Sequence, residues 1–172
     1  VLAERSYTEL GFDTIMPYFS IIMGAAALGA PIDWGQDPWE FDKASGKIVT
    51  GPRMPAAKPP NIWQKADDVK IPADFLEQRE ARAITEAIAI LRQRHPDACI
   101  VGKVMGPWTL AYHMFGPQEF LINVILDPDF VHSVLRDLKD VSVEFANAQI
   151  AAGADVITLA DHSTGDLVRA ET

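Results

Sequence analysis

The segment that decides the fold is CIVGKVMGPWTLAYHMFG, which runs from Cys99 to Gly116. Its first seven residues are almost continuously apolar and have the length of a buried strand. Gly106-Pro107 ends that strand, because this pair is typical of a turn. In the residues that follow, Thr109 and His113 are about one helical turn apart. The segment therefore predicts a buried strand that leads into a polar, aromatic-rich stretch.

The sequence after this segment repeats the same order of elements. Asp127-Pro128 is typical of a helix start, with Asp as the capping residue and Pro in the first turn. Apolar residues then recur at helical spacing down to Gly153. Residues 155–159 form another short apolar run, followed by the polar turn 160–165. We expect a helix, a buried strand and a polar loop here.

The sequence before it predicts a helix over 2–10, a strand over 12–19, a helix over 20–28 with Ser20 near its N-cap, and a long helix from Pro72 to about His95. Strands and helices therefore alternate along the chain. This alternation favours parallel strands covered by helices. Periodicity alone leaves two architectures open, a barrel and an open doubly wound sheet. No Gly-rich phosphate-binding motif follows any predicted strand, so nucleotide binding has little support.

Residues 29–72 interrupt this alternation. The stretch is rich in Pro, Gly, Trp and Asp, which do not sustain a regular helix or a central strand. A long excursion inside a compact domain usually has a function or covers a site. We therefore interpret residues 1–172 as one domain with a lid-like insertion at about 30–72.

Composition narrows the classes of function. The formal net charge is −9 and the basic residues are scattered, which argues against a nucleic-acid partner. The longest apolar run, 21–30, is too short to cross a bilayer. The single cysteine, Cys99, excludes an intrachain disulfide, and no signal peptide is visible, so we expect a cytoplasmic protein. Because the chain opens with Val1, its natural N-terminus is expected upstream.

Polar residues that follow predicted strands are the candidates for function, since ligands of parallel α/β folds bind at the carboxyl ends of strands. Asp161-His162 is the first candidate, because a carboxylate beside an imidazole can bind a metal, share a proton or anchor a polar ligand. Asp161 can alternatively cap the following helix. His113 is the second candidate, pointing back into the same mouth. The alternative for His113 is an ordinary packed, hydrogen-bonded histidine.

Aromatic residues near the strand ends have two readings as well. Tyr18 and Trp108 either line a pocket for a flat ligand or belong to the core. Trp34 and Trp39 of the insertion either cover the mouth or tether the loop. His95 and Cys99 lie at the opposite end of their strand and lack the further ligands that a zinc site needs. The chain by itself thus predicts no complete metal site and no nucleophile-base unit.

Several of these stretches resemble the uroporphyrinogen decarboxylase superfamily. The run from Cys99 to Gly116 is similar to the place where a barrel strand enters Gly-x-Pro-aromatic-Thr-Leu. The stretch from Ala148 to Asp161 resembles the next helix and strand of that fold. Ala27-Leu28-Gly29 and Gly51-Pro52 fall where similar elements recur. The resemblance implies a (β/α)8 TIM barrel, of which this chain supplies about three of eight strands, the second to the fourth.

Two chemistries of the superfamily compete. The decarboxylases hold the pyrrole nitrogens of their substrate with an aspartate after the second strand, and Ser20 stands at that position here. A hydroxyl lacks the negative charge that stabilises a cationic pyrrole intermediate. The decarboxylases also tend to have Tyr where His113 stands and Phe-Asp-Ser at residues 160–162. These differences point away from porphyrin chemistry.

The methylcobalamin:coenzyme M methyltransferase branch is similar in Gly-Pro-aromatic-Thr-Leu-Ala-x-His and in the Ala-Asp at 160–161. That resemblance implies a zinc ion that deprotonates a thiol, which then takes a methyl group from cobalt. The zinc ligands are expected beyond residue 172. It also implies a corrinoid on a partner protein as co-substrate, a small thiol or methylated metabolite, and a mouth lined by His113, Asp161 and His162 and shaped by Tyr18, Ser20 and Trp108.

Three functions thus remain open from the sequence. Corrinoid-dependent methyl transfer is the leading hypothesis, and decarboxylation of a tetrapyrrole is the alternative enzyme reaction. A non-catalytic ligand-binding barrel module is the third, because a fold does not fix a function. Three strands of a barrel leave open sheet edges, so we expect the 172-residue piece to need the remainder of the barrel or a partner chain.

Overall fold

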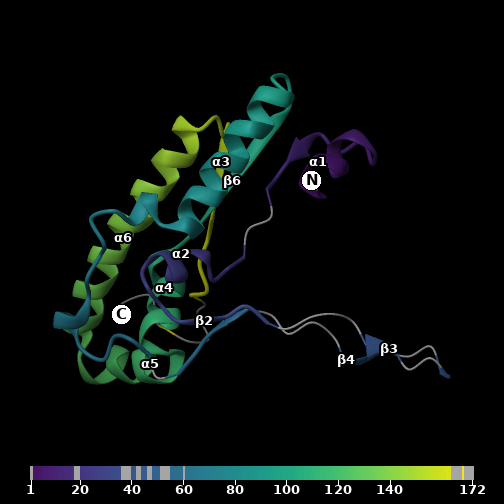
Figure 1. Ribbon diagram of the computed structural model, residues 1–172. Coiled ribbons are helices and arrows are strands. Elements are labelled where there is room, and N and C mark those ends of the chain that lie inside the picture. Colours follow the sequence, from purple (N-terminus) through teal and green to yellow (C-terminus); the bar gives the residue numbers. More distant parts are fainter. Residues whose placement is uncertain are drawn as a thin grey trace.

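A computed structural model describes residues 2–17, 20–35, 40–41, 44–45, 48–50, 55–59, 61–163 and 168 of the chain. Figure 1 shows two long helices lying along a narrow sheet, with three shorter helices of the chain's middle part near one end of the sheet and the first helix of the chain near the other end. The helices are α1 (Leu2–Thr8), α2 (Met23–Ala27), α3 (Arg79–Arg94), α4 (Pro107–Phe115), α5 (Pro117–Leu126) and α6 (Pro128–Ala151), and the short 3-10 turns are η1 (Ala66–Asp68) and η2 (Phe75–Glu77).

The described chain holds a parallel sheet of three strands in the order β1 (Thr14–Ile15), β6 (Cys99–Met105), β7 (Val156–Ala160). Thr14 pairs with Cys99, and Val101 pairs with Val156. Helices α3 and α6 pack against each other and against β6, so they cover one face of the sheet. The alternation of parallel strands and covering helices is confirmed. Strand order that follows chain order is what a barrel requires, and the complete barrel remains a prediction.

Burial explains why these segments form these elements. In β6 the buried Ile100 and Val104 alternate with half-buried residues, so alternate side chains face the helices. On the helix side, the fully buried Ile88 of α3 and Val134 and Leu138 of α6 complete the core. Asp127 caps α6 as predicted, because its side chain accepts a hydrogen bond from the Phe130 N–H at 3.1 Å.

A glutamine side chain forms hydrogen bonds with the backbone in the middle of β6. Gln149 of α6 is fully buried, and its amide bonds both the N–H and the C=O of Lys103 at 3.0 Å. A neighbouring strand can supply such bonds, and among the described residues the pairing of β1 with β6 extends as far as Ile100. Gly102 allows this approach, because a Cβ there would lie 2.7 Å from the Gln149 oxygen. The side chain of Lys103 therefore lies on the sheet face opposite α6.

Three predicted boundaries were wrong. The helix expected from Pro72 begins at Arg79, after the 3-10 turn η2. The predicted helix over 20–28 is shorter, because the Met23 N–H donates to the Ser20 carbonyl and closes a turn before α2. Ile22, not Ser20, is the N-cap of that helix. The strand expected over 12–19 has two described residues, and Pro17 cannot donate to a ladder.

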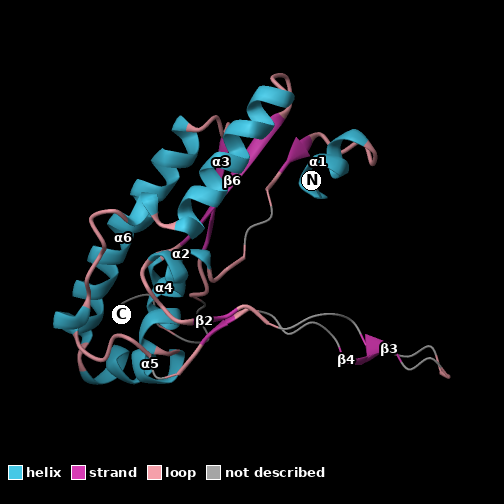
Figure 2. Cartoon of the chain, viewed as in Figure 1, coloured by secondary structure: helices cyan, strands magenta, loops and turns pink. Residues whose placement is uncertain are grey.

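The insertion forms paired strands in its described parts. β2 (Ile32–Asp33) pairs antiparallel with β5 (Ala56–Ala57), and β3 (Glu40–Phe41) pairs antiparallel with β4 (Ile48–Thr50). Figure 2 shows β2 close to the body and β3–β4 extending away from it. Trp34 is 48% exposed, whereas Trp39 lies outside the described residues. Its described strands therefore form two antiparallel pairs, which we call the arm, and the role of the insertion as a lid stays a prediction.

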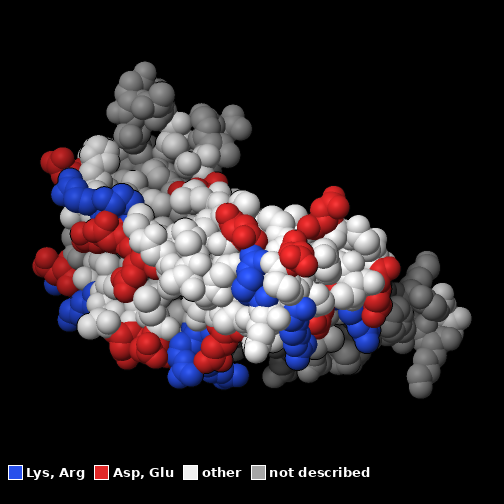
Figure 3. Space-filling view, turned by 90° about the horizontal axis from the view of Figure 1, so that it is seen from above, with Lys and Arg blue, Asp and Glu red and all other residues white. Residues whose placement is uncertain are grey.

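The surface carries both signs of charge. On the face drawn in Figure 3, acidic and basic side chains are interspersed among neutral ones. In the described part of the chain, no helix combines the length and the apolar character that crossing a membrane requires.

Candidate active site

The carboxyl ends of β6 and β7 bring Asp161 onto the start of α4. The carboxylate accepts hydrogen bonds from the Thr109 N–H at 2.7 Å, the Thr109 hydroxyl at 2.8 Å and the Trp108 N–H at 3.3 Å. These N–H groups belong to the first turn of α4, which has no intrahelical partner for them. Asp161 is therefore a capping residue for α4, the helix after β6. The alternative, that Asp161 caps a helix following its own strand, concerns residues outside the described part of the chain.

Gly106 makes this contact possible. A Cβ at position 106 would overlap with the Asp161 carboxylate, so no larger residue fits while the cap is in place. The Gly106 N–H also donates to the Ala160 carbonyl at 2.8 Å, which extends the pairing of β6 with β7 by one residue. The Gly-Pro that ended the predicted strand is thus the close-approach point between two strand ends.

Thr109 connects Asp161 to His162. Its hydroxyl accepts a hydrogen bond from the His162 N–H at 2.9 Å and lies 3.3 Å from Nδ1 of His162. The hydroxyl hydrogen is committed to the ionised carboxylate of Asp161, which cannot donate. Towards Nδ1 the hydroxyl therefore acts as an acceptor, which assigns the proton of a neutral His162 to Nδ1. Nε2 of His162 is then the nitrogen with a free lone pair, on a largely exposed ring.

His113 follows Thr109 by four residues, so both side chains lie on one face of α4. Burial, with a smaller contribution from the positive form of His162, lowers the pKa of His113. His113 is therefore neutral at pH 7. Its Nε2 is buried and has no hydrogen-bond partner among the residues that the structure describes. A neutral imidazole with an uncommitted nitrogen can accept a proton or bind a polar group of a ligand.

Trp108 and Tyr112 occupy the adjacent face of α4. Their rings pack edge to face at 6.0 Å, and both meet Phe120 of α5. Trp108 is only 8% exposed, yet no described residue bonds its Nε1 or the Tyr112 hydroxyl. Each buried polar atom without a partner costs about 1–3 kcal/mol. Both readings of Trp108 therefore hold in part, because its ring is core and its N–H is available.

The described residues do not form a zinc site. No group of three or more His, Cys, Asp or Glu side chains comes together in the part of the chain that the structure describes. Asp161 is already occupied by N–H and O–H donors, which leaves His113 and His162 as nitrogen ligands at most. A structural or catalytic zinc needs at least three protein ligands. The zinc implied by the resemblance does not fit these residues alone.

Comparison with known proteins decides the family. The family model for uroporphyrinogen decarboxylase matches residues 2–172. The chain belongs to the uroporphyrinogen decarboxylase family.

Within this family, the chain is similar to methyltransferases. It is 30% identical to the methylcobamide:CoM methyltransferase MtaA of Methanosarcina barkeri over 99% of this chain and 47% of that protein. It is also 30% identical to the methylated-thiol–coenzyme M methyltransferase of Methanosarcina mazei, over 99% of this chain and 43% of that protein. A solved structure, a methyltransferase from Methanosarcina mazei, superimposes with a TM-score of 0.81 at 28% identity, covering 98% of this chain and 46% of its own. The chain therefore spans about half the length of these relatives.

The other residues considered for a site in the sequence form no described hydrogen bond with this cluster or lie outside the described residues. Ser20 is buried, but no hydrogen bond joins it to His113, Asp161 or His162 within the described structure. Tyr18 lies outside the described residues. His95 bonds Glu4 at 3.0 Å, far along the chain from the candidate site. The structure thus brings together Trp108, His113, Asp161 and His162.

Sequence reasoning assigned no role to Thr109 or Tyr112. Thr109 is the residue through which Asp161 and His162 meet, and Tyr112 carries one of the three unpartnered polar atoms. The spacing of four residues in the pairs Thr109–His113 and Trp108–Tyr112 was the available signal. It predicts two pairs on adjacent faces of one helix. The position of the first turn of α4 then sets the direction in which both faces point.

Proposed function

We propose that this chain is part of a corrinoid-dependent methyltransferase, which moves a methyl group between a corrinoid and a small thiol or methylated metabolite. The corrinoid is carried on a partner protein. Relatives at 30% identity that bear methylcobamide:CoM and methylated-thiol methyltransferase names support this assignment. Because the chain spans about half of these relatives, the donor, the acceptor and the partner are inferred from them.

The single observation that carries the proposal is the uncommitted nitrogen of His113. Transfer to a thiol breaks the S–H bond and the carbon–cobalt bond and forms an S–CH3 bond. Both electrons of the carbon–cobalt bond stay on the corrinoid, and one proton leaves the thiol. His113 is neutral at pH 7 because its pKa is lowered, and its buried Nε2 has no partner among the described residues, so we assign it the role of proton acceptor at the mouth.

Asp161 and Thr109 are positioning residues in this proposal. Together they fix the first turn of α4, which carries His113 one turn later, and they fix the ring of His162 through the Thr109 hydroxyl. His162 then presents Nε2 to the same mouth as a hydrogen-bond acceptor or a ligand. The zinc expected from the family resemblance stays a proposal, with its ligands beyond residue 172.

The alternative function, decarboxylation of a tetrapyrrole, would need a carboxylate at a position where this chain has a serine. By the resemblance, Ser20 takes the place of the aspartate that holds the substrate of the decarboxylases. A buried hydroxyl cannot offset the positive charge of a protonated pyrrole. The methyl-transfer reaction needs no such carboxylate.

We also propose that β1, β6 and β7 are the second to fourth strands of a (β/α)8 barrel, with the arm at 30–72 closing over its mouth. Exposed apolar residues at the β7 edge support this: Leu159 is 61% exposed and Val156 is 46% exposed. A further strand and helix would cover them. The 172-residue piece made alone should therefore associate or aggregate. A well-folded monomer by light scattering and circular dichroism would contradict this proposal.

Two assays on one preparation of the longest natural form test the function. The first follows loss of the methyl–cobalt absorption band of methylcobalamin with thiol acceptors, with and without zinc. The second measures CO2 release from uroporphyrinogen. Thiol-dependent loss of the band without CO2 release supports methyl transfer. CO2 release without methyl transfer identifies a decarboxylase, and neither activity in a folded, zinc-loaded protein favours a binding module.

A further inference from the structure

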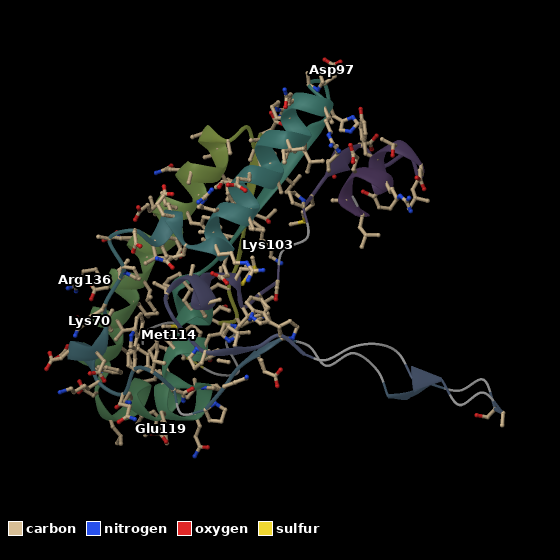
Figure 4. All side chains as sticks on the ribbon, viewed as in Figure 1. Lys70, Asp97, Lys103, Met114, Glu119 and Arg136 are labelled. Atoms are coloured by element: carbon tan, nitrogen blue, oxygen red, sulfur yellow. The ribbon has the colours of Figure 1, made fainter. Side chains whose placement is uncertain are left out.

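A cavity lies away from the strand ends. It is enclosed by Pro59 and residues 61–64 on one side and by the helices α4 and α5 on the other. Its volume is about 500 Å³, which lies within the range of small-molecule sites. Its walls include Asn61, Trp63, Gln64, Phe115, Glu119 and Asn123. Figure 4 shows Glu119 on α5 at the edge of the molecule, with Met114 of α4 further inside.

The segment on one side of this cavity is fastened to the end of α4. The Asn61 side-chain amide donates to the Phe115 carbonyl at 2.8 Å, and the Trp63 N–H donates to the Met114 carbonyl at 3.4 Å. Gly116 has φ = 86°, and a Cβ there would overlap with the Asn61 amide. Two carbonyls of the last turn of α4 are thus used as anchors. The cavity is built by defined contacts, not by a loose loop.

These anchors also decide which atoms the cavity offers. The NH2 group of Asn61 is engaged by Phe115, and the NH2 group of Asn123 donates to the Glu119 carbonyl at 3.0 Å. This fixes the orientation of both side-chain amides, and no described residue donates a hydrogen bond to their oxygens. Two of the polar side chains in the wall therefore present acceptors.

The charge of the cavity wall is negative, which suits a positively charged ligand as the acceptor oxygens do. Glu119 brings a carboxylate, and no ion pair joins it to a cation among the described residues. The described lining contains neither Lys nor Arg. The aromatic rings of Trp63 and Phe115 lie 5.6 Å apart at 59° and form the floor. Aromatic faces attract cations, and the attraction adds to that of a nearby carboxylate.

We propose that this cavity binds a small organic ammonium ion. The ammonium group would take the position between the Glu119 carboxylate and the oxygens of Asn61 and Asn123, and the apolar part of the ligand would meet Trp63 and Phe115. The concave shape and volume favour a free small molecule over a side chain of a partner protein. The proposal is independent of methyl transfer at the strand ends.

Choline and its uncharged carbon analogue 3,3-dimethyl-1-butanol form a matched pair of probes. Isothermal titration of the longest natural form at low ionic strength should show saturable binding of choline and much weaker binding of the alcohol. Equal binding of the two would mean a merely apolar cavity and would overturn the proposal. Absence of saturable choline binding would overturn it as well.

Charge variants locate the site. Glu119→Gln should weaken choline binding about fivefold, because it removes the carboxylate and keeps the shape. Glu144→Gln, on an exposed position of α6, should leave binding unchanged. Unchanged binding in Glu119→Gln, with circular dichroism showing both variants folded, would contradict this site. Binding of a lysine-containing peptide without binding of choline would identify a protein-docking surface instead.

Discussion

The two ends of the β6–β7 pair differ in whether their polar side chains have hydrogen-bond partners. At the amino end, the Arg92 guanidinium donates to the carbonyls of Gly153, Pro96 and Ala98 and pairs with Asp155. Asp155 also accepts from the Ile100 N–H at 2.8 Å, which together with Arg92 lowers the pKa of its carboxyl. Arg92 and Asp155, the two charged groups that join these strands, are therefore both used within the chain.

At the carboxyl end, Asp161 also has hydrogen-bond partners for its carboxylate. The polar atoms of the residues on the helix that it caps do not all have such partners among the described residues. Nε2 of His113, Nε1 of Trp108 and the Tyr112 hydroxyl are buried, and none of these three atoms has a partner in the described part of the chain. An end that only stabilises the fold would satisfy these atoms. Arg92 and Asp155 thus hold the strands together at the amino end, whereas we propose that the carboxyl end holds side chains ready for a ligand.

Asp161→Ala should have the largest effect, because it disturbs both the cap and the site. We expect the free energy of unfolding to fall by about 2 kcal/mol and the methyl-transfer rate to fall about 100-fold. The matched control is Asp127→Ala, another helix cap, which should cost about 1 kcal/mol and leave the rate unchanged. Urea unfolding and the methylcobalamin assay measure the two quantities. Equal rates in both variants would remove the link between Asp161 and the site.

Arg92→Met breaks the amino end without touching the carboxyl end. It should lower the free energy of unfolding by about 2 kcal/mol, because several carbonyls and Asp155 lose their partner. The rate per folded molecule should stay as in the wild type. Arg136→Met, at the exposed position on α6 labelled in Figure 4, should change neither quantity. A reduced rate in folded Arg92→Met would show that the two ends are not separate.

Thr109→Val removes the hydroxyl and keeps the size of the side chain. Stability should fall by about 1 kcal/mol, and the rate should fall about tenfold because His162 loses its partner at Nδ1. Thr109→Ser, which keeps the hydroxyl, should restore most of both. If serine is no better than valine, the methyl group of Thr109 matters and the hydrogen bonds to Asp161 and His162 do not.

The pH dependence of stability gives the smallest effect. His113 has a lowered pKa in the folded chain, so the unfolded chain binds its proton more readily. Stability should therefore be complete above about pH 6.5 and should decline as the pH falls from there towards the folded pKa. In His113→Gln this part of the decline should be absent. An identical pH profile for wild type and variant in urea unfolding would show that His113 is not held neutral by the fold.

Local patterns predicted the elements that depend on local contacts. The strand 99–105 and the Asp127 cap of α6 were confirmed, since each is encoded within a few residues. Ser20 was wrong as an N-cap because a backbone turn precedes α2, and this turn has no signature that separates it from a helix start. Asp161 was predicted as a site residue, and that role stays a prediction; its contact with α4 was not predicted, because Thr109 lies 52 residues away in the sequence. Long-range approach through Gly106 requires the structure.

The most direct test of the account is the single-turnover loss of the methyl–cobalt band with wild type and His113→Gln, each mixed with methylcobalamin, a thiol and zinc. His132→Gln, at an exposed position on α6, is the control. The account predicts a loss of about 100-fold in His113→Gln and a wild-type rate in His132→Gln. A wild-type rate in folded His113→Gln would contradict the claim that the carboxyl end of β6 and β7 is the site of proton transfer.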